Sequence, residues 1–495
     1  MKIIPPIDTY PGVVRFCETR WGKVALLLAF AIILLINGVS YWTELTLLAG
    51  VLSFLPEHRE ILLSLAALYW LVVHKDWTRW DFIHQITAPA QQPEWVVNLW
   101  VAALLAVIFG GIWLFFNHVR RRGGSFTARR PVQVLLSVYF AMLLAAGTLP
   151  LQGTARMLLW LLIALVAPYL WFFAYALQDA GSKSADRFPI QFGSFHPFYM
   201  SPLDSSTPFG KGRAYLRKTE ARTSKDLSVV QLKAVKLLLW ATFLHVVDAL
   251  FVFLVLTERR RSSVILNHLF DRLHVTIPNF AVPDLEAAID LTAMGVRLPV
   301  HVAWGSLVAH FIEALLAISI SGHIAVACCR MSGFNILRNT YRPLQSQTIA
   351  DFWNRYYYYF KELLVEFFFL PTYVRHFKKY RRLRLAVATF AAATFGNALY
   401  HFFKDFHYVT ELGFWTALAG FRVYLLYSTI LGAGIVASQL RSHKLDPNRP
   451  WFRRALASAG VLVFFCLLEV FDYEGRAHSL RTHFAFFMNL FSWRG

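Results

Sequence analysis

The sequence predicts an all-α integral membrane protein that crosses the bilayer many times. Of its 495 residues, 57% are hydrophobic and 16% are charged, whereas soluble domains are about 45–50% apolar and about 25% charged. The apolar residues form continuous blocks, and several blocks reach the roughly 20 residues that a spanning helix needs. Barrel strands would alternate apolar and polar residues instead. We therefore expect helices, and no independent soluble domain.

The apolar blocks predict about 10 to 12 transmembrane helices. Two blocks are short, 44–56 and 60–74, and are compatible with one hairpin, a re-entrant pair or two tilted spans. Basic residues precede the first block without a clear small-residue cleavage site, as in a signal anchor. The candidate spans are 24–40, 44–56, 60–74, 96–117, 131–150, 155–177, 234–256, 302–328, 355–374, 384–403, 411–438 and 455–471.

Polar stretches divide the chain into three parts. Residues 1–177 form an N-terminal set of transmembrane helices, 178–233 a basic polar loop, and 234–495 a second membrane region. Within the last part, segment 257–300 carries acidic residues among apolar ones at helical spacing. This pattern predicts re-entrant or amphipathic helices at the membrane interface.

The formal net charge of +20 comes from Lys and Arg that cluster between the apolar blocks. Such clusters favour the cytoplasmic side and attract anionic lipid headgroups, so we expect membrane lipids and no nucleic acid as partners. The cluster at 120–130 and the loop at 178–233 should both be cytoplasmic. Arg259–Arg261 stand at the opposite end of the following span, so the orientation stays open there. The four cysteines have no ligand spacing and are expected to be buried hydrophobic residues.

The richest group of ionisable residues near membrane depth lies between 351 and 411. Glu362 and Glu366 share a helical face, which suits either acid–base work or pairing with Lys361. His401 follows an apolar stretch and could act as a general base or as a packing residue. Asp405, one helical turn later, could orient its ring. No metal is expected, because the spacing of the histidines and carboxylates matches no ligand set.

Segment 332–369 carries a Gly-Phe pair, an asparagine, an aromatic-x-Pro turn, a Thr-Ile pair and a Phe-Trp-x-Arg element, and His401 stands 44 residues after Tyr357 (401 − 357). The residues of this pattern are Gly333, Phe334, Asn339, Tyr341, Pro343, Thr348, Ile349, Phe352, Trp353 and Arg355. The pattern resembles the signature of the membrane-bound O-acyltransferase (MBOAT) family, in particular its bacterial branch of alginate O-acetylase and the D-alanyl transfer protein. In that family, a Phe-Trp-x-Arg-Trp-His element begins a helix, and a histidine that corresponds to His401 follows in the next span.

This chain departs from the family at the head of the helix, where Trp-His is replaced by Tyr356 and Tyr357. A tyrosine hydroxyl has a pKa near 10 and donates a hydrogen bond more readily than it accepts a proton. The resemblance implies catalytic roles for His401, Tyr357 and Asn354, with Tyr356 or Glu362 as alternatives at the second position. It further implies substrate-binding roles for Asn339, Trp353, Arg355, Glu362 and Asp405.

The resemblance implies an O-acyltransferase in the bacterial cytoplasmic membrane. The acyl group, for example acetyl, would pass from an acyl-CoA or acyl-carrier-protein thioester to a hydroxyl of a cell-surface glycan or lipid. No bound cofactor is expected. An extracytoplasmic partner protein is compatible with the O-acyltransferase hypothesis. The alternatives are a transporter or flippase whose path is lined by the polar cluster 351–411, a divergent member of the family, and a polyprenyl-phosphate glycosyltransferase.

Overall fold

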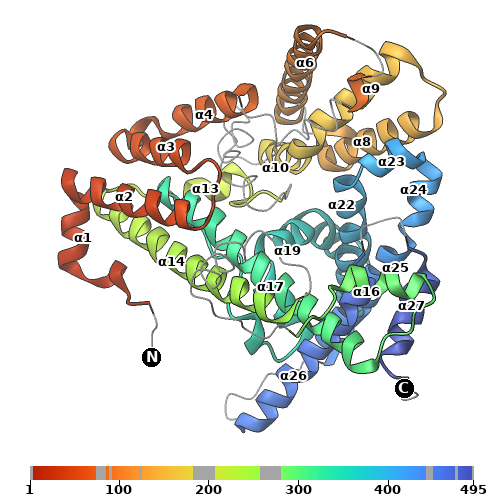
Figure 1. The fold of residues 1–495 in the computed structure, drawn as a ribbon. Coiled ribbons are helices and arrows are strands. Elements are labelled where there is room, and N and C mark those ends of the chain that lie inside the picture. The colour runs from red at the N-terminus through yellow and green to blue at the C-terminus, as the bar shows by residue number, and fades with distance from the viewer. Residues whose placement is uncertain are drawn as a thin grey trace. The chain divides into compact units, whose positions relative to one another are not determined.

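The computed structural model describes residues 4–73, 85–88, 92–121, 125–181, 207–256, 280–441, 450–473 and 478–492. Helices account for 82% of these residues, and none of them belongs to a strand. The only β pairing among them consists of isolated bridges, such as Glu220 with Phe334. The predicted all-α fold class is therefore confirmed (Figure 1).

Seven helices within the described residues are long and apolar enough to cross a membrane, which makes the chain a multi-pass membrane protein. An eighth span is added if α1 (Pro11–Glu18) and α2 (Arg20–Ile36) count as one, although they bend by 99° at their junction. The predicted total of 10 to 12 also included shorter or broken helices, so it stays a prediction. The seven are Glu94–Arg121, Pro131–Thr148, Gly153–Ala180, Ser224–Val255, Val300–Met331, Arg422–Arg441 and Trp451–Phe471.

The helices group into two compact units, each assembled from separate parts of the chain. The first unit comprises Met1–Trp240, Ser321–Arg338 and Phe406–Trp415. In it, α2 lies beside α3 (Trp42–Phe54), which is followed by α4 (Arg59–Val73). The short blocks 44–56 and 60–74 thus form two separate helices.

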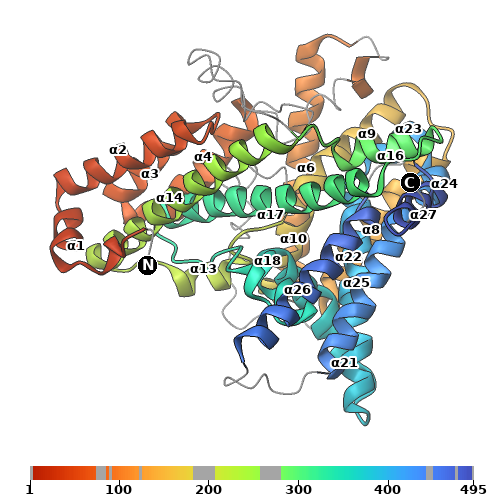
Figure 2. The same ribbon diagram turned by 60° about the horizontal axis from the view of Figure 1, so that its bottom comes forward.

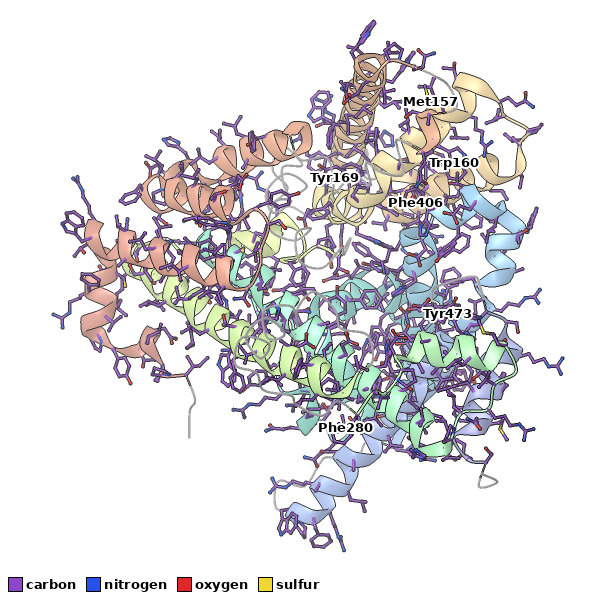
Figure 3. All side chains as sticks on the ribbon, in the orientation of Figure 1. Met157, Trp160, Tyr169, Phe280, Phe406 and Tyr473 are labelled. Atoms are coloured by element: carbon purple, nitrogen blue, oxygen red, sulfur yellow. The ribbon has the colours of Figure 1, made fainter. Side chains whose placement is uncertain are left out.

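The core of the first unit is formed by α9 (Gly153–Val166) and α10 (Leu170–Ala180), which pack against α6 (Glu94–Arg121) and α8 (Pro131–Thr148). Met157 and Trp160 on α9 are almost fully buried (Figure 3). The ring of Tyr169 lies 5.4 Å from Phe109 on α6 and 5.7 Å from Phe173 on α10. This aromatic core explains why the apolar block at 155–177 is buried within the protein.

The polar segment predicted as a loop over 178–233 ends earlier than expected. A short helix, α13 (Arg213–Thr219), lies within it, and the long helix α14 (Ser224–Val255) begins ten residues before its predicted start. Thr223 Oγ1 accepts a hydrogen bond from Asp226 N at 3.0 Å, while Asp226 Oδ2 accepts one from Thr223 N at 3.3 Å. This reciprocal capping stabilises a polar first turn that hydropathy alone does not mark as helical.

The second unit comprises Ala241–Ile320, Asn339–Asp405 and Thr416–Gly495. Its central element is α25 (Arg422–Arg441). It packs against α18 (Ile349–Tyr356), α21 (Arg381–Phe390) and α22 (Asn397–Lys404) of the 349–404 region, and against α26 (Trp451–Leu468). Figure 2 shows α21 alongside α25. The elements of the 349–404 region are α18 (Ile349–Tyr356), α19 (Tyr358–Leu364), η8 (Val365–Phe369), α20 (Leu370–Arg375), α21 (Arg381–Phe390), η9 (Ala391–Gly396) and α22 (Asn397–Lys404).

Two further helices of the second unit bear on the predicted interfacial segment 257–300. Its part 257–279 lies outside the described residues, but α16 (Leu285–Ala293) is present, and Asp284 Oδ1 caps it by accepting from Ala287 N at 2.7 Å. α16 packs against α27 (Leu480–Asn489). Asp290 on α16 pairs with His478 at 2.6 Å. The C-terminal span predicted at 411–438 divides into α24 (Phe414–Gly420) and α25.

Candidate functional site

The helix that begins the motif region is interrupted at Tyr357. Thr348 Oγ1 caps α18 by accepting a hydrogen bond from Asp351 N at 3.0 Å. α18 ends at Tyr356, and Tyr357 has φ −135° and ψ 75°, which lies outside the helical region. The chain becomes helical again at Tyr358. Tyr357 therefore stands at a helix break and not within a continuous helix from 355 to 374.

Residues 339–341 pair with the backbone groups that this break exposes. Asn339 accepts hydrogen bonds from the first two N–H groups of α19, with its carbonyl oxygen from Tyr358 at 3.0 Å and with Oδ1 from Tyr359 at 3.3 Å. At the end of α18, Thr340 Oγ1 donates to the Tyr356 carbonyl at 2.7 Å, and Tyr341 N donates to the Arg355 carbonyl at 2.8 Å. Asn339 was predicted to bind substrate. In the structure it is buried and acts as a cap for α19, because helix termini need partners for their free N–H groups.

Two π-helical segments, η8 and η9, pack against each other and set the approach of the two following helices. Gly396 in η9 permits this contact, because a Cβ there would lie 2.6 Å from Cδ2 of Phe368 in η8. Gly432 similarly permits α25 to approach η9, because a Cβ there would lie 2.1 Å from Oγ1 of Thr394. π-helical turns inside α-helices occur often at functional sites.

Phe360 on α19 joins the two predicted catalytic elements. The centroid of its ring lies 5.7 Å from that of His401 and 4.7 Å from that of Tyr400, both on α22. It also lies 5.5 Å from the ring of Tyr357 and 6.0 Å from that of Trp353. The structure thus groups His401, Tyr357 and Trp353 around one buried phenylalanine ring. All three predicted residues are half-buried.

On α25, Tyr424 packs against the imidazole of His401, with centroids 4.5 Å apart and an interplanar angle of 35°. Its hydroxyl donates a hydrogen bond to Oδ1 of Asn397 at 3.2 Å. Asn397 begins α22 and precedes His401 by one helical turn, so both side chains lie on one face. Sequence reasoning missed both residues. The spacing of Asn397 from His401 was a usable signal, whereas Tyr424 had none.

The other predicted site residues are arranged differently. Asn354 on α18 is exposed to solvent. Arg355 forms an ion pair with Asp351 at 2.8 Å, and Glu362 is paired with Lys361. Asp405 is buried, and its backbone N–H donates to the carbonyl of His401 at 3.0 Å. Among the charged candidates, Arg355 and Glu362 therefore have partners within their own helices.

The basic run between α20 and α21 is exposed. Arg384 is anchored there, because it donates to the carbonyl of Tyr373 and its guanidinium lies 3.9 Å from the centroid of that ring. The remaining side chains are accessible to a polyanion or to lipid headgroups. They are Arg375, Lys378, Lys379, Arg381 and Arg382.

The half-buried imidazole of His401 packs against the rings of Tyr400 and Tyr424. A histidine side chain is the usual general base in enzymes. Within the described part of the chain, no three His, Cys, Asp or Glu side chains are grouped so as to hold a metal ion. No protein-family model matches this chain, and no curated protein matches it significantly. The functional interpretation therefore depends on the motif residues and on their arrangement around Phe360.

Proposed function

We propose that this protein is a membrane-bound O-acyltransferase of the MBOAT type that acts in the bacterial cytoplasmic membrane. The observation that carries the proposal is the grouping of His401 with Tyr357 and Trp353 around Phe360. These residues come from two segments whose order and spacing resemble the family signature.

In the proposed reaction, His401 removes the proton from an acceptor hydroxyl as its oxygen attacks the carbonyl carbon of a thioester. The new C–O bond produces a tetrahedral oxyanion, which collapses as the C–S bond breaks. The proton on His401 then passes to the departing thiolate, so that an ester and a free thiol leave. No covalent enzyme intermediate is required, because the thioester is already activated.

Tyr357 is the proposed donor to the acyl carbonyl oxygen. A hydrogen bond that strengthens as the oxyanion forms accelerates this step. The tyrosine lies at a helix break, and its ring contacts the same phenylalanine as His401. The exposed side chain of Asn354 makes it the weaker candidate for this role.

The acyl donor is proposed to be acyl-CoA or an acylated carrier protein. Both carry phosphate or acidic groups, which suit the exposed basic run between α20 and α21. The same run also suits the anionic headgroups of the inner leaflet. The proposed acceptor is a hydroxyl of a cell-surface glycan or lipid, and an extracytoplasmic protein is a proposed partner.

Replacement of His401 tests the proposal directly. Membranes containing His401→Ala should transfer labelled acyl groups at least about 100-fold more slowly than wild type, which is the contribution expected of a general base. His245→Ala on α14 is the matched control, because His245 is also half-buried but lies on an unbroken helix. Transfer that persists in His401→Ala, in protein that is equally abundant, would contradict the assignment.

Two further measurements separate the proposed activity from the alternatives. Tyr357→Phe should lower the rate about 10- to 100-fold if its hydroxyl stabilises the oxyanion, whereas a full rate would direct attention to Asn354. His401→Gln should be as inactive as His401→Ala in an enzyme, but a gating histidine in a transporter would retain partial function.

Mass spectrometry of surface polymers and lipids from a deletion strain should identify the acceptor by the loss of its ester.

A further inference from the structure

Besides Phe360, the imidazole of His401 contacts Tyr424, a residue outside the resemblance. α22 packs against α25, and the Tyr424 ring lies 4.5 Å from the imidazole at an angle of 35°. Tyr424 is among the most deeply buried large side chains of the protein, with 1% of its surface exposed. An aromatic face within about 6 Å of a cationic group stabilises that group. The Tyr424 ring therefore lies within range of such a contact with an imidazolium at His401.

Tyr424 is held in place at both ends of its side chain. Its hydroxyl donates to Oδ1 of Asn397 at 3.2 Å, and its ring stacks on Phe421 with centroids 5.2 Å apart. Asn397 is fully buried, and its Nδ2 has no hydrogen-bond partner among the described residues. A buried amide with an unpaired donor costs stability that a leucine would not. The presence of asparagine at this position therefore indicates that its bond to Tyr424 serves the site.

We propose that Tyr424, anchored by Asn397, is a positioning residue that orients His401 and stabilises the imidazolium formed during acyl transfer. This inference rests on the proposed function, because the imidazolium arises only when His401 takes the proton of the acceptor. The protonated state is short-lived, so a fixed aromatic face stabilises the transition state more than the resting enzyme. The effect should accordingly fall on kcat and not on KM.

The experiment removes the ring and its anchor separately. In membranes, Tyr424→Leu should lower kcat for acyl transfer about 3- to 30-fold, with KM for the donor unchanged, because a desolvated cation–π contact has that magnitude. The acid limb of its pH–rate profile should move to lower pH, since the imidazolium loses its partner. Tyr424→Phe and Asn397→Leu keep the ring but lose the anchor, so their kcat should fall less, and their acid limb should stay near that of wild type.

The ionisable groups on the elements that carry or contact His401 are unchanged in these variants, so a moved limb can be attributed to the ring. They include Lys404 and Asp405 on α22, Tyr427 and Arg422 on α25, Tyr357 just before α19, and Tyr358, Lys361 and Glu362 on α19. Tyr139→Leu on α8 is the matched control, because Tyr139 is as deeply buried but belongs to the first unit. Its kcat and pH profile should equal those of wild type.

A chemical measurement keeps the inference independent of the activity. Diethyl pyrocarbonate reacts with neutral imidazole, and mass spectrometry of the His401 peptide gives the pH midpoint of that reaction in purified protein. Tyr424→Leu should lower this midpoint, and Tyr424→Met, which fills the volume without a ring, should do the same. Absence of transfer by wild type would remove the proposed function alone. A midpoint, kcat and acid limb that equal those of wild type in folded Tyr424→Leu or Tyr424→Met would overturn the inference.

Discussion

The helix α17 (Val300–Met331) and the region from α18 to α22 differ sharply, although both are largely apolar. α17 runs for 32 residues without a break. Residues 349–404 are instead divided among seven short elements, two of them π-helical, with Tyr357 and residues 376–380 outside these elements. Long straight helices are the ordinary way to satisfy the backbone in a membrane. The broken region therefore needs a physical explanation.

The two regions satisfy their polar groups in different ways. In α17, Ser306 and Ser319 donate to carbonyls one turn earlier in the same helix, at 3.1 and 2.7 Å. In the broken region, the free backbone groups around Tyr357 are paired with residues 339–341, which precede α18 and belong to no helix. A continuous helix pairs its backbone groups within its own residues, whereas a broken helix needs hydrogen-bond partners from neighbouring segments. The irregular backbone therefore lies in the elements that carry Tyr357 and His401 or adjoin them.

The largest effect on stability and acyl transfer is expected when a side chain replaces the hydrogen of Gly396. A Cβ at this position would overlap the ring of Phe368, so Gly396→Ala should separate η8 from η9 and destabilise the protein by about 1–3 kcal/mol. Transfer should fall on the order of 10- to 100-fold, because a displacement of about 1 Å at a reacting group has that effect. Melting in detergent and acyl transfer in membranes measure the two effects.

Gly110→Ala on α6 is the control for this change. A Cβ at Gly110 has no neighbour within 4 Å, so alanine should leave stability unchanged or raise it by up to about 1 kcal/mol through its better helix propensity. If both alanine variants melted and reacted alike, the packing of the two π-helical segments would not support the site.

A smaller effect is expected at the cap of α19. Asn339→Ala removes the Oδ1 acceptor of Tyr359 N but leaves the backbone acceptor of Tyr358 N, so stability should fall by about 1 kcal/mol. The head of α19 carries Phe360, so kcat should fall about 10-fold while KM changes little. Asn339→Asp keeps the acceptor and should be closer to wild type. Equal rates for Asn339→Ala and wild type would show that the break persists without this cap.

The smallest effect is expected from His483 on α27, which contrasts with His401. His483 is fully buried, and its Nδ1 donates to the carbonyl of Val470 at 2.7 Å. Tyr473, labelled in Figure 3, packs on its ring at 4.9 Å, and His478 lies near it at 6.3 Å. Burial lowers the pKa of His483, and the charge of His478 lowers it further, while the bond to Val470 acts in the opposite direction.

The sign of the pH dependence follows from this lowered pKa. The folded protein favours neutral His483, so its contribution to stability is complete above the ordinary pKa of about 6.5 and is lost as the pH falls toward the folded-state value. Between pH 7 and pH 5, the melting temperature should fall by an amount on the order of 1 °C more in wild type than in His483→Gln. Acyl transfer at pH 7 should be nearly unaffected, in contrast to His401→Ala. A strong loss of transfer in folded His483→Gln would contradict a purely structural role.

Much of the fold could be predicted because a transmembrane helix pairs its backbone N–H and C=O groups within its own residues. Continuous apolar stretches therefore located α6, α8, α14 and α17 within a few residues, although the start of α14 was misplaced because Thr223 and Asp226 cap a polar turn. The break at Tyr357 was not predicted. Its residues are helix-compatible, and the partners of its free backbone groups lie in residues 339–341.

The sequence alone predicts an all-α membrane protein and indicates His401 and Tyr357 as candidate catalytic residues. Which side chains contact these two residues follows only from the tertiary structure. It places Asn339 as a cap, leaves Asn354 exposed, and brings Phe360 and Tyr424 into contact with His401. The physical reason is that a hydropathy pattern reports contact with lipid along one helix. The contacts of an imidazole depend on how closely neighbouring helices approach, which Gly396 and Gly432 permit only in the folded protein.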